Sequence, residues 1–285
     1  MSFSLFGGKK KEPALRPMKR SDLSRVVDII NEHDEDDAEE AYESLSHSIE
    51  GMFVLDESGG FSLDSKSGVI GVIGARQDPD VQDICWLSWT YVTESRQGEG
   101  WGRMMMEEII EMLKADGIRK LFITTSDYEE DGEDIYAEAK KLYTSMGAKL
   151  ELTVPEFHDE EEAQLIYGLP LIEEDSYEAI EPITGTLEFY DVNPMAESEM
   201  GFILGWRVHD EDEDIDHIPP VREQLKHYRQ EGIQHKARFL LATLPSDVSS
   251  SAEKELHEAR FDKVGHLKDF HAPGLHEEYW VQMLK

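Results

Sequence analysis

The sequence predicts a mixed α/β (α+β) fold, in which helices flank a mixed central sheet and a second, shortened domain of the same kind follows. Three observations lead to this prediction. Residues 14–171 alternate runs of strand-like and helix-like hydrophobic periodicity. The same segment closes on two neighbouring strand-like runs, 148–157 and 163–171, which are typical of an antiparallel pair. Residues 182–285 then repeat part of that order of elements.

Strands are expected where short apolar runs lie between turn residues. The run "SGVIGVIGARQ" is rich in β-branched residues, and "DICWLSWTYV" combines them with aromatic residues, as strands typically do. "RKLFITTS" is apolar enough at its centre to be a buried strand. The strands of the first domain are predicted at residues 14–19, 51–57, 67–77, 83–92, 119–126, 148–157 and 163–171.

Helices are expected where apolar residues recur every three or four positions. One face of the third helix is apolar at Met105, Ile109, Met112 and Leu113. Gly117 follows this helix and is a typical residue for ending it. We assign the methionine-rich stripe to the core. The helices of the first domain are predicted at residues 21–33, 36–49, 103–117 and 133–147.

The second half of the chain resembles the first. Residues 221–243 repeat the order helix, glycine, strand of residues 106–125, and residues 252–270 resemble residues 137–152. The predicted domains are a flexible tail (1–13), the first domain (14–171), an acidic linker (172–181) and a degenerate, shortened second copy (182–285).

The formal net charge of −34 at pH 7 limits the partners. A field this negative repels DNA, RNA and anionic lipid, so neither nucleic acid nor membrane is expected as a partner. It attracts cations such as amines, polyamines and basic peptides, although the ordinary role of such acidity is solubility or adaptation to salt. The single cysteine, Cys85, excludes an intrachain disulfide and fits a reducing compartment, so a cytoplasmic location is predicted.

Three glycines at alternate positions lie between a predicted strand and a predicted helix. The stretch reads Gln97-x-x-Gly100-x-Gly102, with Gly98 between the first two. A helix start presents unpaired N–H groups and the positive end of the helix dipole. Positions without a side chain let a phosphate approach those donors closely, so the stretch predicts a phosphate-binding loop.

Two common phosphate motifs are excluded by spacing. A dinucleotide fingerprint requires G-x-G-x-x-G and a P-loop ends in G-K-[ST], and "GEGWGR" supplies neither. Arg96 and Arg103 flank the loop and are expected to pair with phosphate oxygens. No metal is expected, because the histidines form neither H-E-x-x-H nor a cysteine-paired zinc spacing.

The pattern Q/R-x-x-G-x-G/A between a strand and a helix resembles the acetyl-coenzyme A pyrophosphate loop of the GNAT superfamily of N-acetyltransferases. A later helix resembles the A-x-x-x-Y-x-x-x-G-F element of that family, matching at Ala139, Tyr143 and Gly147. The resemblance covers most of residues 14–171. It implies a GNAT-like sheet and an enzyme that transfers an acetyl group from acetyl-coenzyme A to an amine by direct attack.

The resemblance also implies roles for particular residues. The pantetheine arm is expected to lie along Tyr91, Val92 and Thr93. The pyrophosphate is expected to be bound by Gln97, Gly98, Glu99, Gly100, Trp101, Gly102 and Arg103. Tyr143 is expected to protonate the leaving thiolate as a general acid. Glu94 is nominated as the general base, directly or through water, and the alternative is an acid at the rim without a catalytic role.

Two features depart from the family pattern or leave alternatives open. Tyr136 stands where the family often has asparagine seven residues before the tyrosine. The acidic loop 126–134 either lines the acceptor site and favours cationic amines or is simply solvated. A catalytically silent coenzyme A-binding regulatory or interaction module is the main alternative function, and a nucleotide-binding protein is a third. Monomer and homodimer both stay open.

The second copy is expected to have lost the coenzyme site. Its glycine position places Phe261 opposite Tyr143, without the hydroxyl. The stretch that corresponds to the glycine loop reads "HDEDEDIDHIPP", and its carboxylates would repel a pyrophosphate. The sequence therefore predicts one active site per chain.

Overall fold

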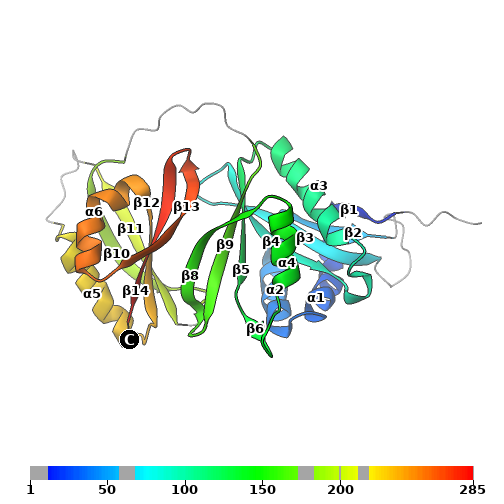
Figure 1. Cartoon of the computed structure of the whole chain (residues 1–285), viewed down its shortest axis with the longest axis horizontal. Helices are drawn as coiled ribbons and strands as arrows, with labels where there is room; N and C mark the ends of the chain where they lie inside the picture. Colours follow the sequence, from blue (N-terminus) through cyan, green and yellow to red (C-terminus); the bar gives the residue numbers. More distant parts are fainter. Residues whose placement is uncertain (1–11, 58–67, 173–182, 199, 211–217, 285) are drawn as a thin grey trace, which may run out of the picture. The chain divides into compact units, whose positions relative to one another are not determined.

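The structure is a computed structural model, drawn in Figure 1, that describes residues 12–57, 68–172, 183–198, 200–210 and 218–284. Its internal contacts divide the chain into two compact units, Met1–Leu121 and Phe122–Lys285. The predicted tail and acidic linker lie almost wholly outside the described residues. The boundary between the units falls inside a strand, and the predicted domain limits stay predictions.

The first unit is built on an antiparallel sheet with the strand order β1-β2-β3-β4. Its strands are β1 (Ala14–Pro17), β2 (Met52–Asp56), β3 (Val69–Gln77) and β4 (Ile84–Val92). Its helices are the 3₁₀ turns η1 (Arg20–Asp22) and η2 (Glu94–Arg96) and the α-helices α1 (Leu23–Asn31), α2 (Glu35–His47) and α3 (Trp101–Ala115). All of these strands and α-helices overlap their predicted ranges.

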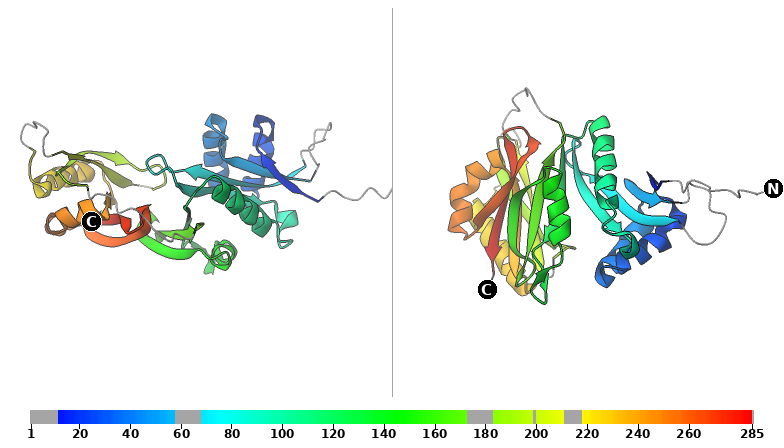
Figure 2. Two further views of the ribbon diagram at one scale, coloured as in Figure 1. Left: turned by 90° about the horizontal axis from the view of Figure 1, so that it is seen from above. Right: turned by 45° about the vertical axis from the view of Figure 1, so that its right-hand side comes forward.

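Helices cover both faces of this sheet. Val72 packs in a cluster with α1 and α2 side chains such as Ile29 and Ala41. A Cβ on the neighbouring Gly71 would lie 3.2 Å from Sδ of Met105 in α3. Because successive strand residues point to opposite faces, α3 lies on the face away from α1 and α2, as Figure 2 shows. The predicted methionine stripe is therefore core, with Met105 and Met106 fully buried.

The second unit begins within β5 (Lys120–Ser126) and contains the rest of the chain. Its other elements are β6 (Glu129–Glu130), β7 (Glu133–Asp134), α4 (Ala137–Ser145), β8 (Lys149–Asp159), β9 (Glu162–Pro170), β10 (Thr186–Pro194), β11 (Gly201–His209), α5 (Val221–Gln234), β12 (Phe239–Pro245), α6 (Ser246–Glu258), β13 (Asp262–Ala272) and β14 (Leu275–Met283). β8 and β9 form the predicted antiparallel pair.

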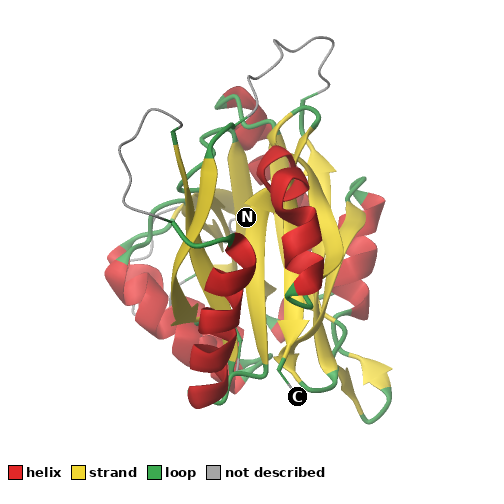
Figure 3. Cartoon of the chain, turned by 90° about the vertical axis from the view of Figure 1, so that its left-hand side faces the viewer, coloured by secondary structure: helices red, strands yellow, loops and turns green. Residues whose placement is uncertain are grey.

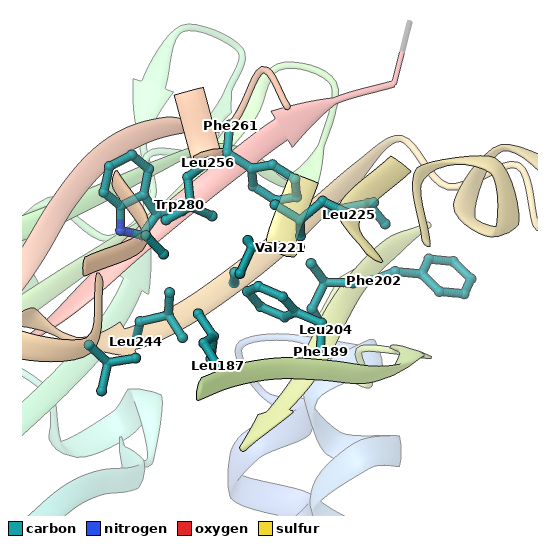
Figure 4. Packing of buried hydrophobic residues seen from close by; sticks show 14 of the residues in the cluster. Leu187, Phe189, Phe202, Leu204, Val221, Leu225, Leu244, Leu256, Phe261 and Trp280 are labelled. Atoms are coloured by element: carbon teal, nitrogen blue, oxygen red, sulfur yellow. The ribbon is translucent and has the colours of Figure 1, made fainter. Parts of the chain in front are cut away.

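A five-stranded mixed sheet with the order β10-β11-β12-β14-β13 forms the core of the second half of the chain. β11 and β12 are parallel and are joined through α5, as a βαβ crossover requires. Helices α5 and α6 pack on one face through Leu225 and Leu256, which meet Phe261 and Trp280 in a single apolar cluster (Figure 4). Figure 3 shows helices against strands in both halves, and the predicted mixed α/β class is confirmed.

Strand order supports the predicted internal repeat. Within the second unit, the strand order β5-β9-β8 resembles the order β12-β14-β13. Chain position matches too, because α3 and α5 each precede the first of these strands, and α4 and α6 each follow it.

The helix ends set the residue correspondence and correct one assignment. The N–H of Ala148 donates to the Tyr143 carbonyl oxygen at 3.1 Å, and the N–H of Phe261 donates to that of Leu256 at 2.9 Å. These are the same helix-ending hydrogen bond in α4 and α6. Leu256, rather than Phe261, therefore corresponds to Tyr143. The prediction that Phe261 does so was wrong, because it relied on a glycine that lies further along in the second copy.

The left-handed residues that end these helices differ between the copies. Gly117 and Gly147 have φ values of +80° and +100°, whereas the corresponding residues are Lys236 and Arg260, at +60° and +68°. A side chain in this conformation costs roughly 1–2 kcal/mol. Helices α5 and α6 therefore carry strain at their ends that α3 and α4 avoid with glycine.

We predict that Lys236→Gly and Arg260→Gly each raise the free energy of unfolding by about 0.5–1 kcal/mol, since relief of strain exceeds the greater backbone entropy of glycine. Urea unfolding followed by circular dichroism measures the change. Lys254→Gly, at an exposed site within α6, is the control and should destabilise by about 1 kcal/mol. Destabilisation by Lys236→Gly and Arg260→Gly would contradict the comparison of helix ends.

Within the second unit, β8 and β13 lie side by side (Figure 1). Arg238 donates to the carbonyl oxygens of Glu156 and Phe157 at 2.8 and 3.1 Å, and the Ser198 hydroxyl also donates to that of Phe157. Glu156 in β8 and Asp269 in β13 have nearly equal positive φ values, +51° and +52°. Residues 198 and 238 thus join the predicted second copy to β8 by hydrogen bonds to its backbone.

Candidate functional site

The end of β4 is shaped by a bulge. Tyr91 pairs with Val72 and Ser88 pairs with Gly74, so Trp89 and Thr90 stand opposite the single residue Ile73. Trp89 takes a φ of +26°, which is unusual for a bulky residue. Bulges re-aim the strand beyond them, and this one lies directly before the predicted pantetheine-binding residues.

Beyond the bulge, the three predicted pantetheine-binding residues differ in whether their backbone N–H and C=O groups point toward β3. The N–H of Thr93 donates to the Ile70 carbonyl oxygen of β3 at 2.9 Å. In an antiparallel pair, alternate residues point their N–H and C=O groups toward the partner strand. Tyr91 and Thr93 therefore point theirs toward β3, and Val92 points its own away from β3.

A carboxylate from the turn between α1 and α2 holds the residues that follow β4. Glu32 accepts hydrogen bonds from the Thr93 hydroxyl at 2.5 Å and from the Glu94 N–H at 2.8 Å. Arg25 donates to Glu32 at 3.1 Å and to the Thr93 hydroxyl at 3.2 Å. Burial acts to raise the pKa of Glu32, but these hydrogen bonds outweigh it and lower that pKa below its ordinary value. Glu32 is therefore an ionised clamp and a poor proton acceptor.

Two further side chains from the same region reach β4 and the glycine loop. Nε2 of His33 lies 2.8 Å from the Val92 carbonyl oxygen, and its Nδ1 lies 3.5 Å from Nε2 of Gln97. The Tyr91 hydroxyl donates to Asp37 near the start of α2. The turn between α1 and α2 thus contacts most of the segment from Tyr91 to Gln97.

The glycine loop has the conformation that glycine favours. Gly98 and Gly100 have φ values of +73° and +89°, and a Cβ on either would meet nothing within 4 Å. Gly100 is the N-cap of α3 and, as a glycine, supplies no side-chain capping hydrogen bond. Gly102 lies in the first turn. The loop therefore leads, through open space, to a helix start that its own N-cap residue does not cap with a side chain.

The charged residues of the loop pair with one another. Arg96 forms ion pairs with Glu57 and with Glu99, the latter at 2.9 Å, and its guanidinium lies 5.7 Å from the Trp101 ring centre. The Trp101 indole N–H donates to Glu99 at 2.9 Å. Arg103 lies 3.7 Å from Glu107. Arg96 and Arg103 were predicted to pair with phosphate oxygens. In the structure both guanidinium groups already pair with carboxylates, most closely at Arg96.

Tyr143 lies in the second unit, near the end of α4, with 8 % of its surface exposed. Its ring centre is 6.5 Å from that of Tyr167 in β9. Burial raises the pKa of Tyr143 to about 12, because the phenolate would lose its hydration. The phenol therefore stays protonated at neutral pH, as a proton donor must. In the second copy the corresponding pair is Leu256 and Trp280, both in the apolar core (Figure 4).

The remaining sequence candidates are located as follows. Cys85 is buried, and burial, aided by Asp116 and Asp78, raises its thiol pKa to about 11, which makes it a poor nucleophile. The acidic loop 126–134 contains the β6–β7 hairpin, turning at Asp131 and Gly132.

No group of three His, Cys, Asp or Glu side chains suited to a metal occurs among the described residues. None of the described helices has the length and apolarity to cross a membrane.

Comparison with known families decides the classification. Residues 24–147 match the model of the family described as "Acetyltransferase (GNAT) family". This segment is a GNAT-family acetyltransferase domain. The match includes α1, β4, the glycine loop, α3 and Tyr143. The match supports an acyltransferase whose general chemistry is acetyl transfer.

Several solved structures that align with part of the chain are acetyltransferases by name. The ribosomal-protein-S18-alanine N-acetyltransferase of Escherichia coli is 19% identical, with a TM-score of 0.44, over 58% of this chain and 99% of its own. An N-acetyltransferase from Staphylococcus aureus Mu50 is 20% identical, with a TM-score of 0.42, over 57% and 100%. An aminoglycoside 6′-N-acetyltransferase complexed with coenzyme A is 15% identical, with a TM-score of 0.42, over 57% and 99%. No curated protein matches the sequence.

The structure adds three residues to those predicted from sequence. Arg25, Glu32 and His33 contact the segment after β4, although about 60 positions separate Glu32 and His33 from it. The sequence offered one signal, since two polar residues, Glu32 and His33, interrupt the pattern where α1 ends. Glu94, the nominated base, is exposed directly after β4.

We predict that Glu32→Gln lowers the free energy of unfolding by about 1–2 kcal/mol at pH 7, because it weakens hydrogen bonds that depend on the ionised carboxylate. The folded-state pKa lies below the ordinary value of 4.5, so this stabilisation is present above pH 4.5 and is lost as pH falls through the folded-state pKa. Urea unfolding at pH 7 and between pH 3 and 4.5 measures the difference. The exposed neighbour Glu35→Gln is the control. A difference in the free energy of unfolding between Glu32→Gln and wild type that grows as pH falls would contradict this role of the ionised Glu32 carboxylate.

Proposed function

We propose that this protein is an N-acetyltransferase that transfers the acetyl group of acetyl-coenzyme A to a primary amine of a small molecule or peptide by direct attack. The observation that carries the proposal is the start of α3, where Gly98 and Gly100 are left-handed and leave open space in front of the first turn of the helix. In a chain of net charge −34, a local site for a polyanion requires such a concentration of backbone donors.

The coenzyme is bound by the loop and by the end of β4 in this proposal. The backbone of residues Gln97 to Arg103 holds the pyrophosphate at the start of α3. Glycine at 98 and 100 allows both the left-handed turns and the close approach of phosphate oxygens. The pantetheine arm lies along Tyr91 to Thr93, as a strand would. Since Arg96 already pairs with Glu57 and Glu99, backbone donors supply most of the pyrophosphate contacts.

The acyl group is activated by Val92 in this proposal. Of residues 91 to 93, Val92 is the one that turns its N–H away from β3, so it is the donor we assign to the thioester oxygen. A neutral amine attacks the carbonyl carbon, and the new C–N bond pushes negative charge onto that oxygen, where the Val92 N–H stabilises it.

Collapse of the tetrahedral intermediate breaks the C–S bond and completes the transfer. The departing thiolate takes a proton from the Tyr143 hydroxyl, and the amide nitrogen loses a proton to Glu94, directly or through water. Proton return from Glu94 to Tyr143 through solvent restores the enzyme. The products are an N-acetyl amine and coenzyme A, with no covalent enzyme intermediate.

The second copy supports this assignment by contrast. The helix ends of α3 and α5 make Arg222 the counterpart of Arg103. The N–H of Arg222 donates to a Glu255 carboxylate oxygen at 3.0 Å, so a side chain of α6 already occupies this helix start. The predicted acidic stretch, 209–220, lies mostly outside the described residues. We propose that the second copy binds no coenzyme at the equivalent position.

The acceptor is tested with a panel of polyamines, amino acids, aminoglycosides and basic peptides, by following thiol release from acetyl-coenzyme A. Thiol release with at least one amine, accompanied by an N-acetylated product in mass spectrometry, is the expected result. Tight coenzyme binding without turnover across the panel would favour a silent coenzyme A-binding module instead.

We predict that Tyr143→Phe lowers kcat roughly 10²- to 10⁴-fold, as loss of a general acid does, and changes the Kd of coenzyme A less than about threefold. Because the pKa of Tyr143 is raised to about 12, its acid form persists through pH 10. The wild-type pH–rate profile should therefore show no fall caused by Tyr143 below about pH 11. An unchanged kcat in the Phe variant would exclude this role.

We predict that Gly100→Ala weakens acetyl-coenzyme A binding at least tenfold, or about 1.4 kcal/mol, because the methyl group strains a φ of +89° and narrows the approach to α3. Calorimetric titration measures the Kd. Gly117→Ala is the matched control, since Gly117 is also left-handed, at +80°, with open space around it, but lies at the other end of α3. Equal loss of affinity in both variants would argue against a ligand role for Gly100.

A further inference from the structure

The turn between α1 and α2 contacts the end of β4 and the first residue of the proposed coenzyme loop, and His33 is the side chain that contacts both. We propose that His33 is a positioning residue for acetyl transfer, which orients the Val92 peptide and the Gln97 side chain together. This inference rests on the proposed function, because it gives Val92 the role of thioester donor.

The two ring nitrogens of His33 have distinct partners. Nε2 lies 2.8 Å from the Val92 carbonyl oxygen, which can only accept, so Nε2 carries the hydrogen. In the neutral ring Nδ1 is then the acceptor, and the amide nitrogen of Gln97 lies 3.5 Å from it as a donor. The ring also lies 5.4 Å, centre to centre, from Tyr91. One imidazole thus contacts residues 91, 92 and 97.

The contact to Val92 matters because of where that residue points. Val92 turns its carbonyl oxygen and its N–H away from β3, so β3 bonds neither group directly and restrains them only through the peptides that they share with Thr93 and Tyr91. A hydrogen bond from His33 to the carbonyl oxygen restricts rotation of the Val92 backbone. It thereby sets the direction of the N–H on the same residue, which is the proposed donor to the developing oxyanion.

Neighbouring contacts hold the rest of the segment and leave this task to His33. Glu32 binds the Thr93 hydroxyl and the Glu94 N–H, and Asp37 accepts from the Tyr91 hydroxyl. None of these three side-chain hydrogen bonds involves the Val92 carbonyl oxygen or the Gln97 amide. His33 itself is anchored, since its N–H donates to the Ile30 carbonyl oxygen at 2.8 Å at the end of α1.

Loss of this contact should act on the transition state more than on coenzyme binding. The pyrophosphate is assigned to the backbone of Gln97 to Arg103, where His33 contacts only the side chain of Gln97. Misalignment of a catalytic donor by about 1 Å can cost about 100-fold in rate. We therefore expect His33→Ala to lower kcat roughly 10- to 100-fold, with the Kd of coenzyme A changed less than about threefold.

The experiment compares three full-length variants with the wild type. His33→Ala removes both contacts, whereas His33→Gln keeps an N–H donor of similar reach and should restore kcat to within about threefold of wild type. His47→Ala, at the exposed end of α2, is the matched control for histidine removal. The readouts are kcat, amine KM, coenzyme A Kd by calorimetry, and amide hydrogen exchange of residues 91–97 in the free protein.

Each outcome decides the proposal. A fall in kcat with His33→Ala, recovery with His33→Gln and faster exchange of residues 91–97 in His33→Ala alone support it. A kcat equal to that of His47→Ala overturns it, as does an equal loss with His33→Gln. A wild type without turnover on any amine means that the proposed function has failed. In that case unchanged exchange of residues 91–97 in His33→Ala overturns the positioning contact, and faster exchange supports it.

Discussion

The start of α3 is the constraint on which the account of this protein depends. Aligned peptide dipoles make a helix start electropositive, and the first N–H groups of a helix need partners from outside it. Here the N-cap is a left-handed glycine that has no side chain to supply one. In a chain with 62 acidic and 28 basic residues, a polyanionic coenzyme finds few favourable positions, so a backbone site of this kind determines where it is accommodated.

The starts of α3 and α5, which correspond in the predicted repeat, differ between the two halves of the chain. In the first half the glycines keep the helix start open, and β4 carries a bulge directly before it. In the second half the register shift lies in β10 instead of β11, and Glu255 satisfies a helix N–H from within the fold. Leu256 and Trp280 fill the position of the tyrosine pair with apolar side chains. The predicted second copy shares its strand order with the first. It also makes hydrogen bonds to the backbone of β8.

Much of the fold could be predicted from sequence, because apolar periodicity and glycine punctuation are local signals. The helix starting at Trp101 and the strand ending at Val92 are examples. The hairpin of β6 and β7 was read as a loop, although Asp131-Gly132 is a typical two-residue hairpin turn. The pairing of Leu256 with Tyr143 was missed because residues other than glycine, such as Arg260, take the left-handed position there. The contacts of Glu32 and His33 were beyond prediction, since they join residues about 60 positions apart through the folded sheet.

The most direct test of one donor site per chain is calorimetric titration of the full-length protein with acetyl-coenzyme A. The account predicts one molecule bound per chain, displaced by coenzyme A and not by ATP or NAD. Two molecules bound per chain would contradict the assignment of the second copy. Preference for ATP or NAD, or no binding, would contradict the assignment of the glycine loop to coenzyme A.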